Sequence, residues 1–257
     1  MSEDKAPVGA ERVLTVLIAL AQEPDGLRLE EIATLLGSPK STVHRALASL
    51  RHVGLATQLS RGTYVLGDEF LRLAFLHQER RSSVSRIEPI LRELTAEFHE
   101  TTHYAVLDGS DVVYHAKRDP TAGAIRLSSI VGGRNPAHST AVGKLLLAYR
   151  YGDNDGLRGW LGTRTLASKT AQTMTKIGQL ASSLVAIREQ GFAVDDQENE
   201  IGVNCLALPI FLDASDAPTG AVSVSGLTFR TPLAQLTERV DTVRDIIRSY
   251  DIRTSAS

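Results

Sequence analysis

The chain has 257 residues, with 28 Lys or Arg against 30 Asp or Glu and a formal net charge of −2, which excludes a globally basic nucleic-acid-binding protein but leaves a local basic surface open. The length allows one or two domains with full hydrophobic cores, and the single cysteine excludes a disulfide within the chain. The longest apolar stretch, 13–21, is too short to span a membrane and the charged start lacks a signal-peptide core, so we expect a cytoplasmic protein.

Two helices are predicted at the start of the chain. The first carries an apolar stripe on one face, formed by Val13, Val16, Leu17 and Leu20. The second is short, covers 30–36 and closes at Gly37. Its residues expected to face the core are Ile32, Leu35 and Leu36. The tight glycine turn then leads into a further helix, which is typical of a helix-turn-helix.

The third helix is predicted to begin at Pro39. Ser38 can accept a hydrogen bond from a first-turn amide, and proline is harmless at the first helical position. Its apolar residues share one face and are Val43, Ala46, Leu47 and Leu50. Gly54 ends the helix. The opposite face is polar and basic, with Lys40, Ser41, His44, Arg45, Ser49 and His52.

A β-hairpin is predicted directly after this helix. Two short extended segments, 55–59 and 63–67, flank Ser60, Arg61 and Gly62. A hairpin in this place is a wing, and Arg61 at its tip would reach a backbone phosphate or the minor groove. Residues 1–67 therefore read as a winged helix-turn-helix domain.

The third helix and the wing are suited to double-stranded DNA. Cations and small hydroxyls can contact phosphates and base edges. No Asp or Glu occurs from Ile32 to Gly67, so positive charge is concentrated in this part of the chain. The predicted DNA-binding residues are Ser38, Lys40, Ser41, Thr42, His44, Arg45 and Arg61.

A linker helix is predicted over 68–82, where the sequence has no Gly or Pro. Its apolar residues are Phe70, Leu71, Leu73, Ala74 and Leu76. They exceed what a solvated connector needs, so we expect this helix to pack against another protomer. The pair Ser82–Ser83 marks the boundary of a second domain, 83–257.

The second domain mixes strands and helices without regular alternation. Its predicted strands are 102–107, 112–117, 125–130, 205–212 and 221–226. Its predicted helices lie around 87–94, after the loop 136–140, over 177–190 before Gly191, and after Thr231–Pro232. The last of these helices carries Leu233, Leu236, Val240, Val243 and Ile247 inward. We expect an α+β fold with a mostly antiparallel sheet and helices packed on it.

Over essentially its whole length the chain resembles the IclR family of bacterial transcriptional regulators. The resemblance lies in the helix-turn-helix with wing at 29–67, in the segment His138–Lys144, and in the runs 191–198, 202–207 and 222–226. It implies a DNA-binding regulator whose C-terminal, GAF-like domain binds an effector. It also implies homodimers joined through the DNA-binding halves, often paired into tetramers, and small organic acids, often aromatic or keto acids, as effectors.

Carried onto this sequence, the resemblance implies an effector pocket. Its residues would be Leu127, Ala141, Val142, Asp195, Val203, Cys205, Ser223 and Ser225. Amides at a helix start favour a carboxylate, and serines on alternate positions of one strand share a face. Cys205 could equally be a buried core residue, and Asp195 could cap a turn. Two departures from the family pattern are Gln197, where an acid is usual and whose change makes the pocket rim less negative, and Arg28, where a small capping residue is usual.

The main rival is an enzyme of small carboxylate substrates with a fused DNA-binding domain. The residue types of acyl transfer or thiol chemistry are supplied by Ser139, His138, Asp195, Asp196, Glu198 and Cys205. No nucleophile elbow, Walker loop or dinucleotide fingerprint is present, so no enzymatic activity and no cofactor is expected. A purely structural module is disfavoured by the cations placed for DNA. The histidines His103, His115 and His138 lack metal-ligand spacing, so no metal site is expected.

Overall fold

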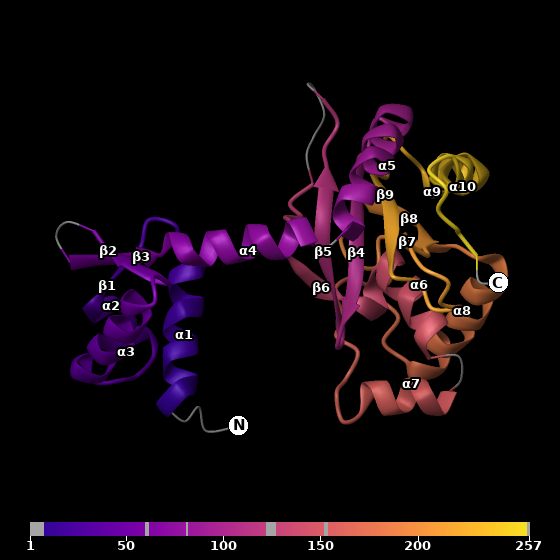
Figure 1. Ribbon diagram of the computed structural model, residues 1–257. Coiled ribbons are helices and arrows are strands. Elements are labelled where there is room, and N and C mark those ends of the chain that lie inside the picture. The colour runs from indigo at the N-terminus through magenta and orange to yellow at the C-terminus, as the bar shows by residue number, and fades with distance from the viewer. Residues whose placement is uncertain (1–7, 60–61, 81, 122–126, 152–153, 256–257) are drawn as a thin grey trace. The chain divides into compact units, whose positions relative to one another are not determined.

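The chain forms two units that divide between residues 81 and 82 (Figure 1). This computed structural model describes residues 8–59, 62–80, 82–121, 127–151 and 154–255. The N-terminal unit has one buried hydrophobic cluster, and the C-terminal unit has two.

Three helices build the core of the N-terminal unit: α1 (Gly9–Gln22), α2 (Leu29–Leu35) and α3 (Lys40–His52). The predicted stripes of α1 and α3 are confirmed, because Val16 and Leu20 pack with the α3 residues in one buried cluster. The α3 residues of that cluster are Val43, Ala46, Leu47 and Leu50. Amphipathic periodicity therefore sets the orientation of both helices.

The start of α3 differs from the prediction. Pro39, not Ser38, is the residue before the helix, and its carbonyl accepts hydrogen bonds from the amides of Thr42 and Val43 at 2.9 and 3.1 Å. The hydroxyl of Ser38 donates instead to the carbonyl of Leu36 at 3.2 Å. Ser38 therefore stabilises the turn and does not cap α3.

In the short helix α2 the predicted burial of Leu35 is wrong, and Glu31 compensates for the missing capping side chain at Arg28. Leu35 is 64% exposed, because the buried arc of α2 is centred between Ile32 and Ala33 and turns Leu35 away from the core. Arg28 precedes the helix, and its side chain has no acceptor atom to cap it. The carboxylate of Glu31 accepts a hydrogen bond from the Arg28 amide at 2.7 Å, which supplies one half of a capping box.

A small antiparallel sheet completes this unit. Its strands are β1 (Leu27–Arg28), β2 (Ala56–Gln58) and β3 (Thr63–Leu66), in the order β1-β3-β2. Strands β2 and β3 are the two arms of the predicted wing, whereas β1 was not predicted from the sequence. Arg61, predicted at the tip of the wing, lies outside the described residues.

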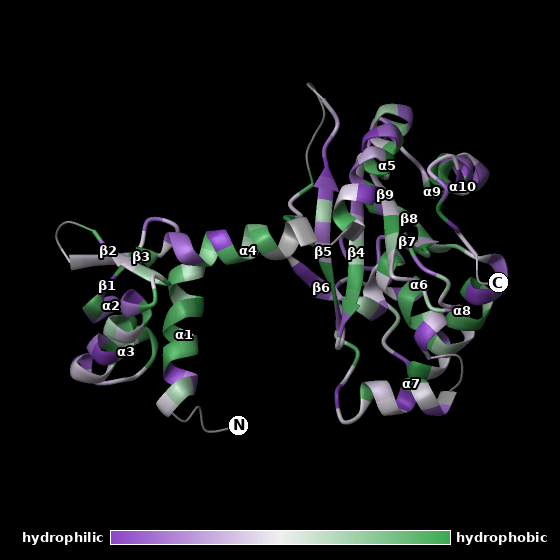
Figure 2. Cartoon of the chain, viewed as in Figure 1, coloured by the Kyte–Doolittle hydropathy of each residue, from purple (hydrophilic) through white to green (hydrophobic). Residues whose placement is uncertain are grey.

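The helix α4 (Asp68–Arg80) follows the wing and contains many hydrophobic residues (Figure 2). Phe70, Leu71, Leu73, Phe75 and Leu76 are all at least 36% exposed. Leu14 and Ile18 of α1 are exposed as well. The N-terminal unit therefore presents apolar surface that its own core does not cover.

The C-terminal unit is built on a six-stranded sheet in the order β6-β5-β4-β9-β8-β7. All its neighbouring strands pair antiparallel. The strands are β4 (Thr101–Asp108), β5 (Asp111–Arg118), β6 (Arg134–Pro136), β7 (Ala193–Asp196), β8 (Val203–Ile210) and β9 (Gly220–Leu227). The α+β class with an antiparallel sheet is confirmed.

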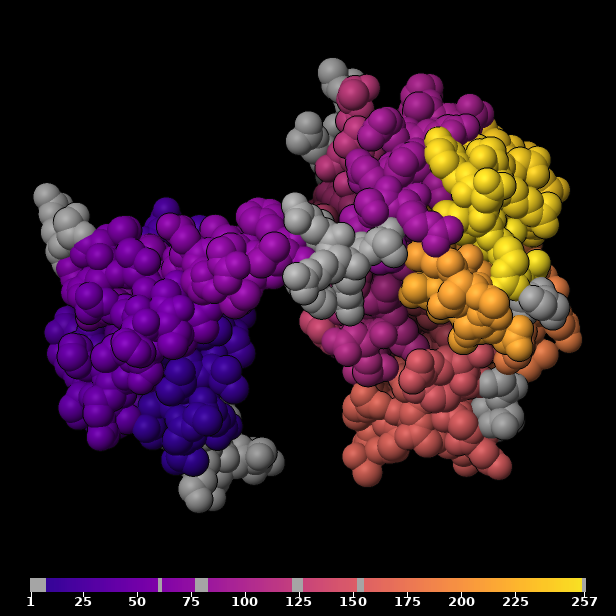
Figure 3. Space-filling model, viewed as in Figure 1, coloured from indigo at the N-terminus to yellow at the C-terminus, as the bar shows by residue number. Residues whose placement is uncertain are grey.

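Helices cover both faces of this sheet. On one face lie α5 (Ser82–Phe98), α9 (Leu233–Glu238) and α10 (Val240–Arg248), and Figure 3 shows α10 in yellow beside α5 in magenta. On the other face lie the short 3-10 turn η2 (Ala137–Ser139) and the helices α6 (Ala141–Arg150), α7 (Asn154–Leu161) and α8 (Ile177–Gln190). The predicted end of α8 is confirmed, because Gly191 takes the left-handed conformation (φ +76°) that glycine tolerates best.

Two predicted elements of this unit are wrong. Residues 127–130 form no strand, because the ammonium of Lys117 binds the carbonyls of Leu127 and Ser129 at 2.9 and 2.7 Å. Residues 125 and 126 lie outside the described part of the chain. The C-terminal helix is two helices, since Arg239 leaves helical geometry between α9 and α10. Its guanidinium packs over the ring of Phe98 at 4.1 Å and pairs with Glu97.

Strand β4 joins the two faces of the sheet. Its residue Thr102 is fully buried against α5, where its hydroxyl lies 2.8 Å from that of Thr95 and donates to the carbonyl of Leu91 at 3.1 Å. Adjacent residues on a strand point to opposite faces, so His103 points to the side covered by α6. One strand therefore contacts both helix layers.

Candidate functional site

The polar face of α3 carries most of the residues predicted to contact DNA. Lys40, Ser41, His44 and Arg45 are exposed, and Thr42 is half-buried. Ser38 is buried in the turn before the helix, so it lies apart from this exposed set. The structure therefore brings a lysine, a serine, a histidine and an arginine onto one accessible helix face, as expected of a recognition helix.

An acidic side chain reaches this basic face. Glu30 of α2 pairs with Lys40 at 2.5 Å, and the Lys40 ammonium lowers the pKa of the Glu30 carboxyl. The acid-free span from Ile32 to Gly67 does not reveal this contact, because Glu30 lies just outside it. Among the described residues, Arg45 has no acidic partner within ion-pair distance, so its charge is the more accessible one.

A pocket of about 300 Å³ lies in the C-terminal unit between the sheet and the start of α6. All of the residues predicted for the effector pocket line it: Leu127, Ala141, Val142, Asp195, Val203, Cys205, Ser223 and Ser225. That these residues bind an effector stays a prediction. The structure does bring together side chains that are up to 98 positions apart in the sequence.

The floor of the pocket is made of two rows of side chains across neighbouring strands. Asp195 of β7, Cys205 of β8 and Ser225 of β9 are direct partners in the sheet register. Ser223 of β9 is the direct partner of His103 on β4. Residues opposite one another in an antiparallel sheet share a face, so register alone places these five side chains on one surface.

The start of α6 forms one wall of the pocket. Thr140 precedes the helix, and its hydroxyl accepts a hydrogen bond from the amide of Gly143 at 3.1 Å. Ala141 and Val142 begin the helix, and amides at these positions have no acceptor within it. A Cβ at Gly143 would lie 2.2 Å from the carbonyl of Ala137, so only glycine lets the helix start so close to η2. This wall suits an anion.

His103 lies between the two β9 serines and Ser129 of the loop before β6. Its Nε2 lies 2.8 Å from the Ser129 hydroxyl, and its Nδ1 lies 3.5 Å from the hydroxyls of both Ser223 and Ser225. Burial, with help from the nearby Lys117, lowers the pKa of His103 to about 3. The imidazole is therefore neutral, with one donor and one acceptor nitrogen.

Asp195 is the buried carboxyl group of the pocket. It is 2% exposed, and its Oδ1 accepts hydrogen bonds from the amides of Glu198 and Asn199 at 2.7 and 3.4 Å. Burial raises the pKa of Asp195 to about 7, against the lowering effect of those amides and of Lys144. The prediction that Asp195 could cap a turn is confirmed, and the same residue also lines the pocket.

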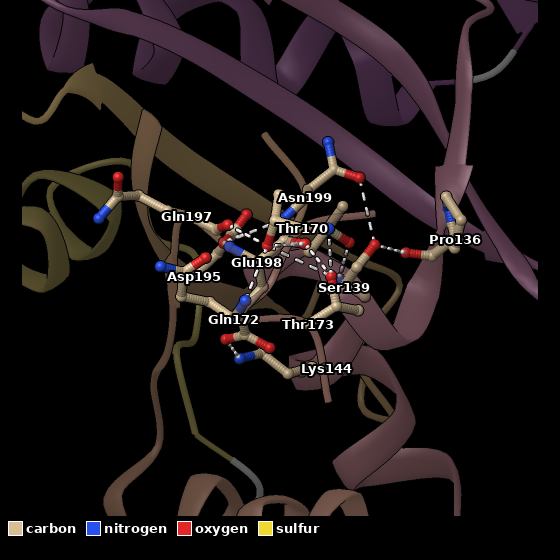
Figure 4. A network of polar contacts seen from close by, with 12 residues as sticks. Pro136, Ser139, Lys144, Thr170, Gln172, Thr173, Asp195, Gln197, Glu198 and Asn199 are labelled. Carbon is tan, nitrogen blue, oxygen red and sulfur yellow. Dashed lines mark hydrogen bonds and ion pairs between the residues drawn. The ribbon is translucent and has the colours of Figure 1, made fainter. Parts of the chain in front are cut away.

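The turn that Asp195 holds is fixed from two further sides (Figure 4). The hydroxyl of Thr170 donates to the carbonyl of Gln197 at 2.7 Å, and that of Thr173 donates to the carbonyl of Glu198 at 2.6 Å. Lys144 of α6 forms a buried ion pair with the Glu198 carboxylate. This turn leads directly to Asn199 and Glu200, which line the pocket. Gln197 does not line it, because its side chain bonds to Asp196 and the Gly202 amide, so the expected effect on the charge of the rim is wrong.

Ser139 and His138, two residues of the rival enzymatic interpretation, are hydrogen-bonded to structural groups and not to each other. The hydroxyl of Ser139 donates to the Pro136 carbonyl and the Asn199 amide oxygen, whereas His138 lies 2.9 Å from the Ala167 carbonyl. Burial raises the pKa of the Cys205 thiol, which disfavours the nucleophilic thiolate. Among the described residues there is no group of His, Cys, Asp or Glu that could hold a metal. None of the helices described here is long and apolar enough to cross a bilayer.

Several residues of the pocket were not predicted from the sequence. They are His103, Tyr114, Ser128, Ser129, Asn135, Thr140, Lys169, Asn199 and Glu200. Strand alternation around the Asp108–Asp111 turn could have placed His103 and Tyr114 on one face, whereas Lys169 and Asn199 lie in loops that give no local signal.

Comparison with known proteins matches both units to family models. The model "IclR helix-turn-helix domain" matches residues 9–60, and "Bacterial transcriptional regulator IclR C-terminal" matches residues 79–251. A curated relative, the HTH-type transcriptional regulator XynR of Escherichia coli K12, is 34% identical over 227 residues, which are 88% of this chain and 88% of the relative.

Two solved structures are similar over most of the chain. The IclR structure of Thermotoga maritima has a TM-score of 0.74 and 26% identity, and the match covers 93% of this chain and 95% of that one. An IclR homologue of Microbacterium hydrocarbonoxydans, solved in complex with 4-hydroxybenzoate, has a TM-score of 0.73 and 21% identity, and the match covers 93% and 98%. The second likeness shows the fold alone.

Proposed function

The chain belongs to the IclR family of bacterial transcriptional regulators, and on that premise we propose that α3 reads an operator under the control of a small organic acid bound in the C-terminal pocket. A DNA-binding helix-turn-helix unit and a C-terminal effector-binding unit are given by the family. The observation that carries the finer proposal is the pocket itself, which gathers the start of α6, Asp195 and the two β9 serines around one small cavity.

The DNA contacts are assigned to the exposed face of α3 and to the wing. In a helix-turn-helix the second helix enters the major groove and places its N-terminal residues against base edges. The proposed contacts are Lys40, Ser41, Thr42, His44 and Arg45, together with Arg61 of the wing. Arg45 is the foremost candidate, because arginine binds guanine edges or phosphate through two parallel hydrogen bonds.

The effector is assigned as an acid because the wall formed by Ala141 and Val142 offers helix-start amides to a carboxylate. The remaining proposed contacts are Leu127, Asp195, Val203, Cys205, Ser223 and Ser225. By linkage, an effector that changes operator affinity must have its own affinity changed by the operator by the same factor. The aromatic acid bound by the Microbacterium homologue is one member of the class to be tested.

The exposed apolar residues of α1 and α4 support a homodimer joined through the N-terminal units. Leu14, Leu73 and Phe75 are 59%, 48% and 62% exposed, which is costly for surface that stays in water. A dimer would present two recognition helices to a pseudo-palindromic operator. Sedimentation of a Leu73→Glu, Phe75→Glu double variant tests this: we expect monomers, and an unchanged dimer would contradict the assignment.

The DNA assignment is tested with an operator selected from a random duplex library. Arg45→Ala should weaken operator binding roughly 10- to 100-fold, since one bidentate contact is lost. The matched control is Arg158→Ala, an exposed arginine of the C-terminal unit. Operator affinity that survives Arg45→Ala intact would show that α3 is not the reading helix.

The effector assignment is tested by thermal shift of the full chain with a panel of organic acids. A ligand of the folded state raises the unfolding midpoint, and Ser223→Ala and Asp195→Asn should reduce that rise while leaving operator affinity in the absence of acid unchanged. An acid whose effect is the same in wild type and in both variants would place the effector outside this pocket.

A further inference from the structure

A second cavity lies in the C-terminal unit where the end of α5 meets α9, and we call it the α5–α9 cavity. Its volume is about 230 Å³. Phe98 and Leu236 of its lining belong to the buried cluster beneath α5, α9 and α10, so it lies on the face of the sheet opposite to α6. The polar side chains that line it are His99, Glu100, Arg230, Thr231, Gln235 and Arg239.

The one carboxylate of this lining is fully engaged. Glu100 is 2% exposed, and the Nε and Nη2 of Arg230 donate to its two oxygens at 2.8 and 2.5 Å. The Thr231 hydroxyl donates to Glu100 as well. A guanidinium has five N–H donors, and Glu100 takes two of those of Arg230. Glu100 therefore fixes the fork of Arg230, whose remaining donors have no acceptor among the described residues.

Arg239 supplies a second guanidinium group, which is held in a different way. It lies over the ring of Phe98, 4.1 Å from the ring centroid, and its Nη2 donates to Glu97. Stacking on an aromatic face fixes the plane of a guanidinium. Glu97 is 49% exposed and does not line the cavity, and it takes one of the five donors of Arg239. Both arginines are thus held in place with donors to spare.

Two exposed side chains add donors at the rim of the cavity. His99 ends α5 in the left-handed conformation (φ +55°), with its amide bonded to the Thr95 carbonyl at 2.9 Å. Gln235 lies on the exposed side of α9. An imidazole and a primary amide can each donate a hydrogen bond to an anion. The cavity therefore combines two cationic forks, two further donors and no carboxylate oxygen without a donor.

This set of donors fits phosphate better than a carboxylate. One guanidinium fork saturates the two oxygens of a carboxylate, whereas a phosphate has further oxygens and can accept from two forks at once. The cavity is also small, because sites for drug-sized ligands have volumes of roughly 300–1,000 Å³. Its size suits an ion or the phosphate end of a small molecule.

We propose that the α5–α9 cavity binds phosphate, as the free ion or as the phosphate group of a small monoester, between the guanidinium groups of Arg230 and Arg239. The site is separate from the pocket beside α6 and does not depend on which acid that pocket takes. Phosphate bound here joins the end of α5 to α9 and so stabilises the folded C-terminal unit.

The test compares anions on the full chain at one pH and ionic strength. Inorganic phosphate, glycerol 3-phosphate, acetate and chloride are studied by isothermal titration and by thermal shift. We expect inorganic phosphate, glycerol 3-phosphate or both to bind and to raise the unfolding midpoint, and the tighter of the two identifies the free ion or the ester as the source. Binding of neither, or of acetate equally well, would overturn the proposal.

Two charge changes at the cavity should act in opposite directions. Gln235→Glu places an anion at the rim and should weaken phosphate binding roughly 10-fold. Glu97→Gln releases Arg239 and removes a nearby anion, so it should tighten phosphate binding several-fold. Gln179→Glu is the matched control, because Gln179 is exposed on α8 and does not line this cavity. Equal phosphate affinities in Gln235→Glu and Gln179→Glu would contradict the proposed place of binding.

A third variant removes one of the two forks. Arg239→Met keeps an apolar contact with Phe98 and leaves no buried charge unpaired, whereas loss of Arg230 would strand the buried Glu100. Circular dichroism without phosphate checks that Arg239→Met folds. We expect it to lose roughly 10-fold or more in phosphate affinity, since hydrogen bonds to a charged group are lost. Phosphate affinity that survives in both Arg239→Met and Gln235→Glu would overturn the proposal.

Discussion

Each unit of the chain has a lysine–glutamate ion pair beside its candidate site, and the two pairs differ in their surroundings. Lys40 of α3 and Glu30 of α2 are 61% and 70% exposed, whereas Lys144 of α6 and Glu198 are 2% and 7% exposed behind the pocket. Exposed pairs contribute little to stability, but a buried charge that loses its partner is costly. The N-terminal unit therefore keeps its charges available to a partner, whereas the C-terminal unit uses charge to fix a turn.

The largest expected effect comes from breaking the buried pair. Lys144→Met leaves the Glu198 carboxylate buried without a cation, and should cost roughly 3–5 kcal/mol of the unfolding free energy of the C-terminal unit. Trp160, the one tryptophan of the chain, is buried in the core of that unit, so its fluorescence in a urea titration reports this transition.

Two further variants serve as controls for Lys144→Met. A second change, Glu198→Leu, should recover most of the lost stability, because it removes the unpaired charge. Lys40→Met should leave the unfolding midpoint of its own unit, followed by circular dichroism, where it is in the wild type. Equal losses from Lys40→Met and Lys144→Met would contradict the distinction drawn between the two pairs.

The next effect in size is on pH dependence, which only the buried site should show. Asp195 has a folded-state pKa of about 7, above its ordinary value of 3.8. Its contribution to the stability of the folded unit is therefore full below pH 4 and is lost as the pH rises through 7. Between pH 5 and pH 8 the wild type should therefore lose roughly 2–4 kcal/mol of unfolding free energy through this carboxyl. Asp195→Asn should not show this loss. Lys144, Glu198 and Cys205 face this carboxyl and belong to the same titration.

For His103 the dependence of stability on pH has the opposite sign. Its folded-state pKa of about 3 lies below the ordinary 6.5, so its contribution is full above pH 6.5 and is lost as the pH falls toward 3. His103→Gln should remove that acid-side loss. Urea titrations of wild type and both variants from pH 4 to 8 check the two signs, and parallel curves for all three proteins would rule out this account.

A smaller effect is expected where α6 meets η2. In Gly143→Ala the new Cβ would lie 2.2 Å from the Ala137 carbonyl, so the helix start must shift. The shift should lower the unfolding free energy by roughly 1–3 kcal/mol and weaken acid binding. Gly159→Ala in α7 meets no atom within 4 Å and should stabilise the same unit slightly, by about 0.5–1 kcal/mol. Trp160 fluorescence and acid titration measure both, and equal results for the two variants would remove the special role of Gly143.

The smallest effect concerns the exposed pair. Glu30→Gln releases Lys40 and removes an anion near the DNA, so operator binding should become roughly 2- to 5-fold tighter at low salt. Raising the salt concentration should abolish the difference. Weaker binding in Glu30→Gln would show that the pair positions Lys40 for DNA and does not compete with it.

The two units also differ in how far the sequence predicts them. The stripe of α3 at Val43, Ala46, Leu47 and Leu50 follows from local periodicity, so its exposed face could be predicted as well. The capping of α3 could not, because the choice between Ser38 and Pro39 depends on where the Ser38 hydroxyl finds a carbonyl. Leu35 was misplaced because a helix as short as α2 defines its buried arc poorly.

The pocket required more than local pattern. Asp195, Cys205 and Ser225 meet through sheet register, which the order of strands in the sequence does not give, and they were named through family resemblance. Lys169 and Asn199 were missed because loops bring them to the pocket through contacts such as those of Thr170 and Thr173. The missing strand at 127–130 has the same origin, since the Lys117 side chain satisfies the backbone there.

Strand β4 has a consequence for how such a protein can change over generations. His103 faces the pocket, and its neighbour Thr102 is bonded to α5 on the opposite face of the sheet. Substitutions at the pocket face of the strand can therefore alter the lining of the pocket without touching the face that holds α5. In a regulator built in this way, the pocket can diverge while the packing of α5 on the sheet is conserved.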